Sequence, residues 1–176
     1  MATIALLALF VHLGLWQSGK GERLAALRAQ VAERGQREPQ WMTGQKVVPD
    51  AVLNMPLRVR GQFEGAQQFF VDNRQENGVA GVHVVTPLKI DGTETRVLVN
   101  RGWVAWPNGR QTLPVVAAPP GTVELTGIAV VPSTKKFWLM PENAEARSQL
   151  WSQVDLKRFE VQANAPVQPV VLLQKS

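Results

Sequence analysis

The residue best suited to chemistry in this sequence is Arg101, because it interrupts an otherwise apolar stretch. The β-branched run from Val97 to Val99 predicts a strand, and Trp103 resumes the apolar run after the polar break. If side chains alternate along the strand, Arg101 lies on the same face as Val99 and Trp103, and Gly102 leaves a gap on the opposite face. A guanidinium on an apolar face needs carboxylate, carbonyl or ligand partners.

Arg101 therefore admits two interpretations. Its planar guanidinium could bind the carboxylates of a ligand, such as haem propionates, through paired hydrogen bonds. Alternatively, it fixes a β-bulge by donating to backbone carbonyls or to an acidic residue nearby. We favour the structural interpretation and keep cofactor binding by Arg101 as the alternative.

The two histidines, His12 and His83, are too far apart in the sequence to form a short metal motif. His83 lies on the less apolar face of its predicted strand, which favours a surface or hydrogen-bonded histidine over a ligand-binding one. His12 lies in an apolar segment, where an ionisable group is costly and is a functional candidate by default. Haem ligation by His12 is a hypothesis that weakens if the residue lies near lipid headgroups.

The carboxylates suggest no catalytic pair. Four of them lie in or beside predicted turns, where such side chains serve turn geometry and solubility: Asp72, Glu76, Asp91 and Glu94. No H-E-x-x-H, G-x-S-x-G or phosphate-loop motif occurs either. The sequence therefore predicts neither an enzyme nor a metal site.

The composition predicts one domain with a proper core, since 176 residues include six Trp and six Phe. The absence of cysteine excludes disulfides and thiolate chemistry. The net charge of +5 suits anionic lipid, nucleic acid or an acidic ligand, but the basic residues are scattered, as in a solubilising surface. Because Phe69, Phe70 and Trp103 have no basic residues clustered around them, we expect no nucleic-acid partner.

The N-terminal part predicts two helical segments. Residues 1–17 are nearly all apolar but lack the basic start and cleavage site of a signal peptide, so we expect part of a transmembrane helix that begins before Met1. A short buried core helix is the alternative. Residues 18–38 place Leu24, Leu27 and Val31 at helical spacing, with basic residues on other faces, and predict an amphipathic stalk that Gly35 and Pro39 end. Its basic face could lie against anionic lipid.

Residues 39–176 predict a single soluble β-rich domain. Gln40 to Asp50 has the composition of a linker, and Leu57 to Phe63 alternates as a strand with Gly61 at a bulge position. A second strand is expected from Gln68 to Asn73. Val82 to Ile90 and the strand that begins at Thr95 are expected to form a long hairpin around the Asp91-Gly92 turn.

The remainder of that domain predicts more short elements. Asp155 has the character of a helix N-cap, and Pro169 to Leu173 predicts a final strand. Val123 to Gly127 repeats the order of Leu57 to Gly61, which suggests an internal repeat or a chance match. The fold class predicted is mainly β (α+β): an antiparallel barrel or strongly bent sheet, with an N-terminal membrane and stalk helix and one short C-terminal helix.

With these motifs placed, the chain resembles the surfeit-locus family of cytochrome c oxidase assembly factors, as a bacterial member. The resemblance rests on residues 14–17, on Asp72-Asn73-Arg74 with residues 81–88, and on residues 97–104. The residues with an implied structural or docking role are Trp16, Gln17, Asn73, Arg74, Gly81, Thr86, Pro87, Asn100, Arg101, Gly102 and Trp103.

The resemblance implies a non-enzymatic chaperone that assists haem a delivery to, or maturation of, oxidase subunit I. The implied partners are that subunit, the haem a synthesis machinery and membrane lipid. The implied location is the bacterial inner membrane, with the soluble domain on the periplasmic side. The family places haem binding on a histidine of a second membrane helix that this sequence lacks, so no residue here inherits that role, although the full-length protein could bind haem a. The rival interpretation is a soluble β-barrel module that binds a small ligand or nucleic acid.

Overall fold

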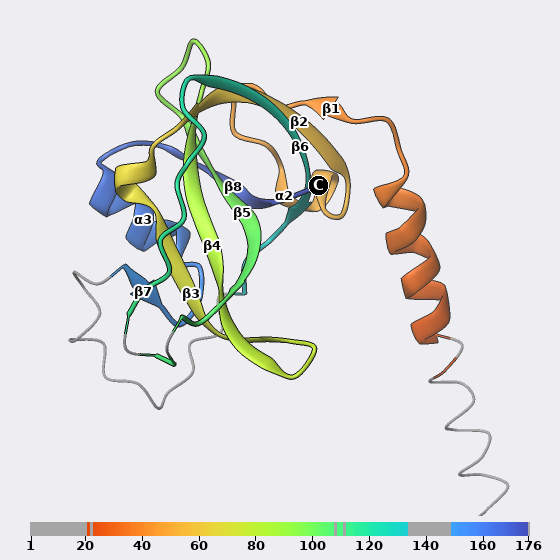
Figure 1. Ribbon diagram of the computed structural model, residues 1–176. Coiled ribbons are helices and arrows are strands. Elements are labelled where there is room, and N and C mark those ends of the chain that lie inside the picture. The colour runs from red at the N-terminus through yellow and green to blue at the C-terminus, as the bar shows by residue number, and fades with distance from the viewer. Residues whose placement is uncertain (1–20, 22, 108, 111, 134–148, 176) are drawn as a thin grey trace, which may run out of the picture. The chain divides into compact units, whose positions relative to one another are not determined.

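The computed structural model describes residues 21, 23–107, 109–110, 112–133 and 149–175 (Figure 1). The predicted membrane segment 1–17, with His12, Trp16 and Gln17, lies outside the described residues. Among the helices that are described, none is long and apolar enough to cross a membrane. The chain divides into two compact units, Met1–Arg37 and Glu38–Ser176.

The first unit is described as a helix over residues 23–35, followed by a turn. The helix ends at Gly35, the first of the two residues predicted to end it and three residues before the predicted boundary at 38. The side chain of Arg37 pairs with Glu33 one turn earlier at 3.4 Å. The apolar side chains of Leu24, Leu27 and Val31 are all exposed on it.

The second unit is built on one sheet of eight strands, with short helices between them. The strands are β1 (Gln40–Trp41), β2 (Pro56–Phe63), β3 (Phe69–Glu76), β4 (Val79–Ile90), β5 (Arg96–Ala105), β6 (Thr122–Val130), β7 (Leu150–Trp151) and β8 (Val167–Gln174). The helices are α2 (Pro49–Val52), the 3-10 turn η1 (Gly65–Gln67) and α3 (Leu156–Ala163). The strand order is β1-β2-β6-β8-β5-β4-β3-β7, and an additional β2–β4 pairing closes β2, β6, β8, β5 and β4 into a barrel. The predicted mainly β, barrel-like fold is confirmed.

Most neighbouring strands are antiparallel, but β8 runs antiparallel to β6 and parallel to β5. This follows from its position, because α3 brings β8 back between two strands that themselves run in opposite directions. The short strands β1 and β7 also pair in parallel, with β2 and β3 respectively. The predicted hairpin of β4 and β5 is confirmed, with Leu88 opposite Val97 and Lys89 opposite Arg96. The ends of β3 and β4 extend beyond the barrel, at the bottom of Figure 1.

The sheet buries apolar side chains on both faces. The barrel interior contains Leu57, Val59, Leu88, Val97 and Leu172, all at most 2% exposed. On the outer face, α3 covers a second cluster that includes Phe69, Val85, Leu98, Trp151 and Phe159. The rings of Phe69 and Trp151 stack with their centroids 4.0 Å apart. Both faces of β5 are therefore buried along the length of strand that belongs to the barrel.

The predicted helix after Asp155 is confirmed, since the Asp155 carboxylate accepts a hydrogen bond of 3.0 Å from the backbone N–H of Arg158. The predicted linker from Gln40 to Asp50 is wrong. Met42 is only 4% exposed, and the fully buried Gln168 amide donates to the carbonyls of Thr43 and Gln45 and accepts from the N–H of Val47. This side-chain amide, together with the β1–β2 pairing, holds in place a segment whose own sequence predicts no regular structure.

The two matching segments of the suggested repeat lie side by side. Leu57 pairs with Gly127 and Gly61 with Val123, so the two five-residue runs pair antiparallel along their whole length. Gly61 is not at a bulge, contrary to the prediction. It pairs with both Val123 and Ile90, and a Cβ atom there would overlap the carbonyl of Lys89. The remainder of the second copy, residues 137–139, lies outside the described residues.

Candidate functional site

The motif residues in the described part of the chain gather where β3, β4 and β5 leave the barrel. A bulge in β5 dominates this region. On β4, Val85 pairs with Asn100 and His83 pairs with Trp103. Two residues of β5, Arg101 and Gly102, therefore lie opposite the single β4 residue Val84. Gly102 has a φ of 111°, a conformation that side chains other than hydrogen strongly disfavour.

The bulge reverses the alternation of side chains along β5. Arg101 lies 5.3 Å above the ring of Phe63, which packs against the barrel interior, whereas Trp103 lies on the outer face beside His83. The prediction that Arg101 and Trp103 share a face is therefore wrong. An extra residue in one strand shifts the two-residue period, and a regular alternation cannot anticipate it.

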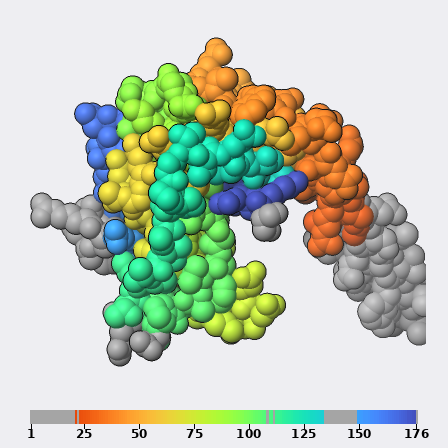
Figure 2. All heavy atoms as spheres, turned by 45° about the horizontal axis from the view of Figure 1, so that its top comes forward, coloured from red at the N-terminus to blue at the C-terminus, as the bar shows by residue number. Residues whose placement is uncertain are grey.

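Arg101 uses its guanidinium to hold neighbouring parts of the protein. It donates to the side-chain oxygen of Gln68 at 3.2 Å and to the carbonyl of Ala117 at 2.9 Å. The same Gln68 oxygen accepts from the buried hydroxyl of Thr86 at 2.8 Å, and the Gln68 amide donates to the carbonyl of Val116 at 3.0 Å. These bonds tie β3, β4 and β5 to the segment between β5 and β6, which runs over the surface beside β3 (Figure 2). Burial lowers the pKa of Arg101. This geometry matches the structural interpretation of Arg101.

Asn100 shapes the bulge from the other face. Its side-chain oxygen accepts from the N–H of Gly102 at 3.0 Å, and its amide nitrogen lies 3.2 Å from Nδ1 of His83. Burial lowers the pKa of His83, and the positive charge of Arg74 lowers it further, while Glu76 acts in the opposite direction. The neutral form of His83 is therefore favoured, which suits a hydrogen-bonding role.

Trp103 fits closely onto β4 because its neighbour there is a glycine. A Cβ atom at Gly81 would overlap the indole ring and the carbonyl of Val104. The indole N–H of Trp103 reaches the carbonyl of Arg74 at 3.4 Å. Gly81, Arg74 and Trp103, which lie in two separate motif stretches, thus form one contact across three strands.

The Asp72-Asn73-Arg74 stretch coincides with an irregularity in β3. The pairing with β4 shifts between Val71 and Arg74, and Asn73 adopts a left-handed conformation with a φ of 56°. Arg110 binds both side chains at this point, the Asp72 carboxylate and the Asn73 oxygen, the latter at 3.0 Å. The Arg74 Nε is buried and has no hydrogen-bond partner.

Pro87 occupies a position in β4 where no backbone donor is needed. Its carbonyl accepts from the N–H of Glu64 at 2.9 Å. This edge of β4 pairs with β3 up to Val85 and with β2 from Leu88 onward, so Pro87 lies in the gap between the two partners. Because the amide nitrogen and carbonyl of one residue point to the same side of a strand, the absent N–H falls in that gap. The ladder with β5 is unaffected.

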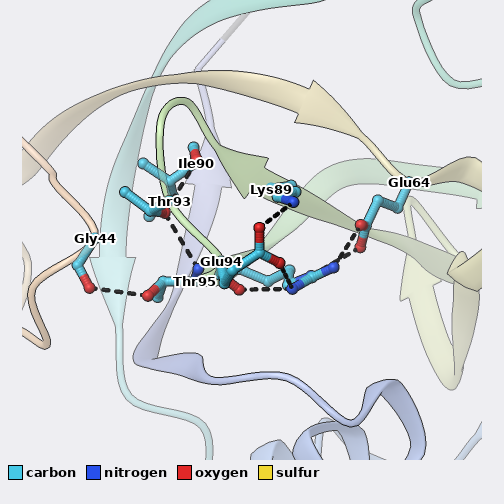
Figure 3. Close-up of polar contacts among 8 residues, drawn as sticks. Gly44, Glu64, Lys89, Ile90, Thr93, Glu94 and Thr95 are labelled. Atoms are coloured by element: carbon cyan, nitrogen blue, oxygen red, sulfur yellow. Dashed lines mark hydrogen bonds and ion pairs between the residues drawn. The ribbon is translucent and has the colours of Figure 1, made fainter.

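The opposite, closed end of the β4–β5 hairpin carries a charged cluster that the sequence did not reveal (Figure 3). Arg96 forms two hydrogen bonds to the Glu64 carboxylate, at 2.9 and 3.1 Å, and a third to the carbonyl of Glu94 at 2.6 Å. Its pKa is raised, chiefly by Glu64. Lys89 pairs with Glu94 at 2.7 Å and lowers the pKa of that carboxyl. The Thr95 hydroxyl donates to the carbonyl of Gly44 at 2.9 Å, which connects the cluster to the segment before β2.

The described polar groups of the bulged end bond mainly to one another. Among the described residues, no three His, Asp or Glu side chains lie close enough together to hold a metal ion. A haem site would need a ligating histidine and cations free to bind propionates. In the described structure, His83 lies against Asn100, and Arg101 donates to protein acceptors. The described motif residues instead determine the shape of the β3–β4–β5 surface.

Comparison with known proteins gives a consistent result. The family model described as the SURF1 family matches residues 4–176. Surfeit locus protein 1 of Mus musculus is 27% identical over 163 residues, and the protein of the same name from Rattus norvegicus is 28% identical over 162 residues. Each match covers 82% of this chain and 51% of the relative. The chain therefore spans about half the length of the curated relatives it matches.

Proposed function

This chain belongs to the SURF1 family, and from that premise we propose that it is an assembly factor for cytochrome c oxidase that acts by binding and not by catalysis. The observation that carries the proposal is the family match itself, which covers residues 4–176 and so includes all three motif stretches. The described motif side chains are consistent with it, because their hydrogen bonds hold strands and loops in place. Such a site presents a shaped surface to a partner.

The docking surface in this proposal is the outer face of β3, β4 and β5 where they leave the barrel. Trp103 and Arg74 lie there half-buried, with His83 beside Trp103. Tryptophan and arginine are the residue types that most often dominate the binding energy of protein interfaces. Because Gly81 and the bulge fix the position of Trp103, little conformational freedom would be lost on binding.

The finer role that we propose is assistance in haem a delivery to, or maturation of, oxidase subunit I. The partners are that subunit and the haem a synthesis machinery. The protein would lie in the bacterial inner membrane with residues 39–176 on the periplasmic side. We assign haem a contact to no described residue.

Deletion of the gene in its bacterial host tests the proposal. We expect less haem a in the purified oxidase, while the haem a content of total membranes persists, measured by pyridine haemochrome spectra. Restoring the wild-type gene should recover the oxidase, whereas a variant that combines Trp103→Ala and Arg74→Ala should not. Arg60→Ala is the matched control, since Arg60 is an exposed arginine of β2 that pairs with Asp91. A normal oxidase spectrum in the deletion strain would contradict the proposal.

A further inference from the structure

The helix over residues 23–35 carries an exposed apolar seam. Leu24, Leu27 and Val31 are 48%, 56% and 41% exposed, and their spacing places them on one side of the helix. The side directly opposite carries Ala29 and Glu33. A continuous apolar seam on an exposed helix indicates a surface that something else covers.

Arginines flank the seam on both sides. At 100° per residue, Arg28 lies next to Leu24 on one side, and Arg23 lies next to Leu27 on the other. In the part of the chain that the structure describes, neither Arg23 nor Arg28 has an ion-pair or hydrogen-bond partner.

Several arginines of the β-rich unit differ from these two, although Arg74 and Arg101 have no carboxylate partner among the described residues. Four that lie on or beside its strands each pair with a carboxylate: Arg58 with Glu124, Arg60 with Asp91, Arg96 with Glu64 and Arg110 with Asp72. The seam of the helix therefore combines apolar side chains with positive charge that no described residue of the same unit neutralises. The partner that complements both features has an apolar interior and an anionic surface.

We propose that the helix over residues 23–35 lies along an anionic membrane surface, with its apolar seam in the interfacial region and Arg23 and Arg28 on lipid phosphates. Long arginine side chains can keep their charge at the headgroups while their stems cover apolar surface. The inference rests on the membrane location in the proposed function.

A second copy of the chain fits the seam less well. Leu24, Leu27 and Val31 cover little more than one heptad, whereas a stable coiled coil needs about three or four heptads. In a symmetric pair of helices, arginines on both flanks of the seam would also face arginines of the partner, and like charges repel. The charge pattern favours lipid phosphate.

Single-cysteine labelling tests the orientation of the helix, because the native chain contains no cysteine. Leu27→Cys reports the seam and Ala29→Cys, 200° around the helix, is the matched control. Each variant of the full chain is labelled with an environment-sensitive fluorophore and reconstituted into vesicles of phosphatidylcholine, with or without phosphatidylglycerol. We expect the label at position 27 to shift to the blue and resist an aqueous quencher only when phosphatidylglycerol is present. The label at position 29 should stay accessible.

The charge requirement is tested with Arg23→Gln combined with Arg28→Gln. Each arginine near an anionic surface contributes about a fivefold factor, so the equilibrium between bound and free helix should fall roughly 25-fold. Arg58→Gln combined with Arg60→Gln removes the same charge from ion-paired positions of the barrel and should leave the signal at position 27 unchanged. Circular dichroism checks that both double variants keep their helix content.

Three results would overturn the inference. The labels at positions 27 and 29 could give equal signals, or the signal at position 27 could be the same with and without phosphatidylglycerol. The third is efficient inter-chain disulfide formation through Leu27→Cys in phosphatidylcholine alone. The last would identify a second copy as the occupant. No oxidase is present in these vesicles, so failure here leaves the assembly proposal standing. A normal oxidase in the deletion strain would overturn the assembly proposal without changing the fluorescence result.

Discussion

The two ends of the β4–β5 hairpin are held by different kinds of interaction. At the closed end, long charged side chains form ion pairs: Lys89 with Glu94 across the turn, and Arg96 with Glu64, which lies between β2 and η1. At the bulged end, the structure depends on the backbone and on close contact, through Gly81, Gly102 and the Trp103 ring. One end relies on attraction between flexible groups, and the other on the absence of side-chain atoms.

This difference predicts different responses to substitution. A flexible ion pair can rearrange or exchange its partners for water, so its loss costs little. A backbone position that has no space for a Cβ atom offers no such adjustment, because a rigid neighbour must move. The bulged end should therefore be the less tolerant one, and it is also the end that contains most of the described motif residues.

The largest effect is expected for Gly81→Ala. The new methyl group would overlap the Trp103 indole and the Val104 carbonyl, so we expect a loss of roughly 2–4 kcal/mol in the free energy of unfolding. Urea denaturation followed by tryptophan fluorescence measures it. Gly92→Ala at the closed end is the control: its φ is 69° but the space around it is open, so only the conformational cost of about 1 kcal/mol applies. Equal losses in the two variants would remove the contrast between the ends.

The next effect is expected for Arg101→Met, which keeps the apolar bulk beside Phe63 but removes the donors to Gln68 and Ala117. Two hydrogen bonds from a charged donor are lost, one of them to the buried Gln68 side chain, so a cost of about 2 kcal/mol is expected, again by urea denaturation. The segment between β5 and β6 should become more sensitive to limited proteolysis. A variant with normal stability that still lowers haem a in the oxidase would instead support ligand binding by Arg101.

At the closed end, Arg96→Met should cost roughly 1–2 kcal/mol, because Arg96 and Glu64 are only 12% and 23% exposed and Glu64 would be left unpaired. Lys89→Met, which breaks the exposed pair with Glu94, should cost less than about 1 kcal/mol. Measurement at low and high salt separates the two, since salt screens the exposed pair more strongly. A larger loss for Lys89→Met than for Gly81→Ala would reverse the ranking of the two ends.

The smallest effect concerns pH. His83 has a pKa below its ordinary value of 6.5 in the folded protein, so as the pH falls through 6.5 the unfolded chain takes up the proton first. The unfolded state then binds more protons, and stability decreases until the pH passes the folded pKa, below which the contribution levels off. His83→Gln should remove this part of the pH dependence, measured as the difference between urea midpoints of the two proteins. Identical pH profiles would show that the bulged end does not bury His83.

Part of the fold follows from local sequence and could be predicted from it. The β4–β5 hairpin has an alternating pattern on both arms and a turn dipeptide between them, and α3 begins at a capping carboxylate; both signals act over a few residues. Gly102 indicated an irregularity in the strand. The sequence did not show that this irregularity would place Trp103 on the opposite face from Arg101. The motif residues identified the β3–β4–β5 region without showing how they touch one another.

Long-range polar contacts could not be predicted at all. Gln168 fixes Thr43 from 125 residues away in the sequence, and Arg96 pairs with Glu64 from 32 residues away. Neither partner has a local pattern that distinguishes it from an ordinary surface residue. Their roles depend on which strands become neighbours, and strand order is set by the whole chain.

The placement of β8 has a consequence for how the protein is made. β8 lies between β6 and β5 and carries Gln168, so the last of the described strands both closes the barrel and fixes the segment before β2. While the chain emerges from the ribosome, the β4–β5 hairpin can form early, but β6 has no β8 to pair with until residues 167–174 appear. The nascent protein must therefore exist as an open sheet with an exposed edge, and the time between making β6 and making β8 is when it most needs protection from aggregation.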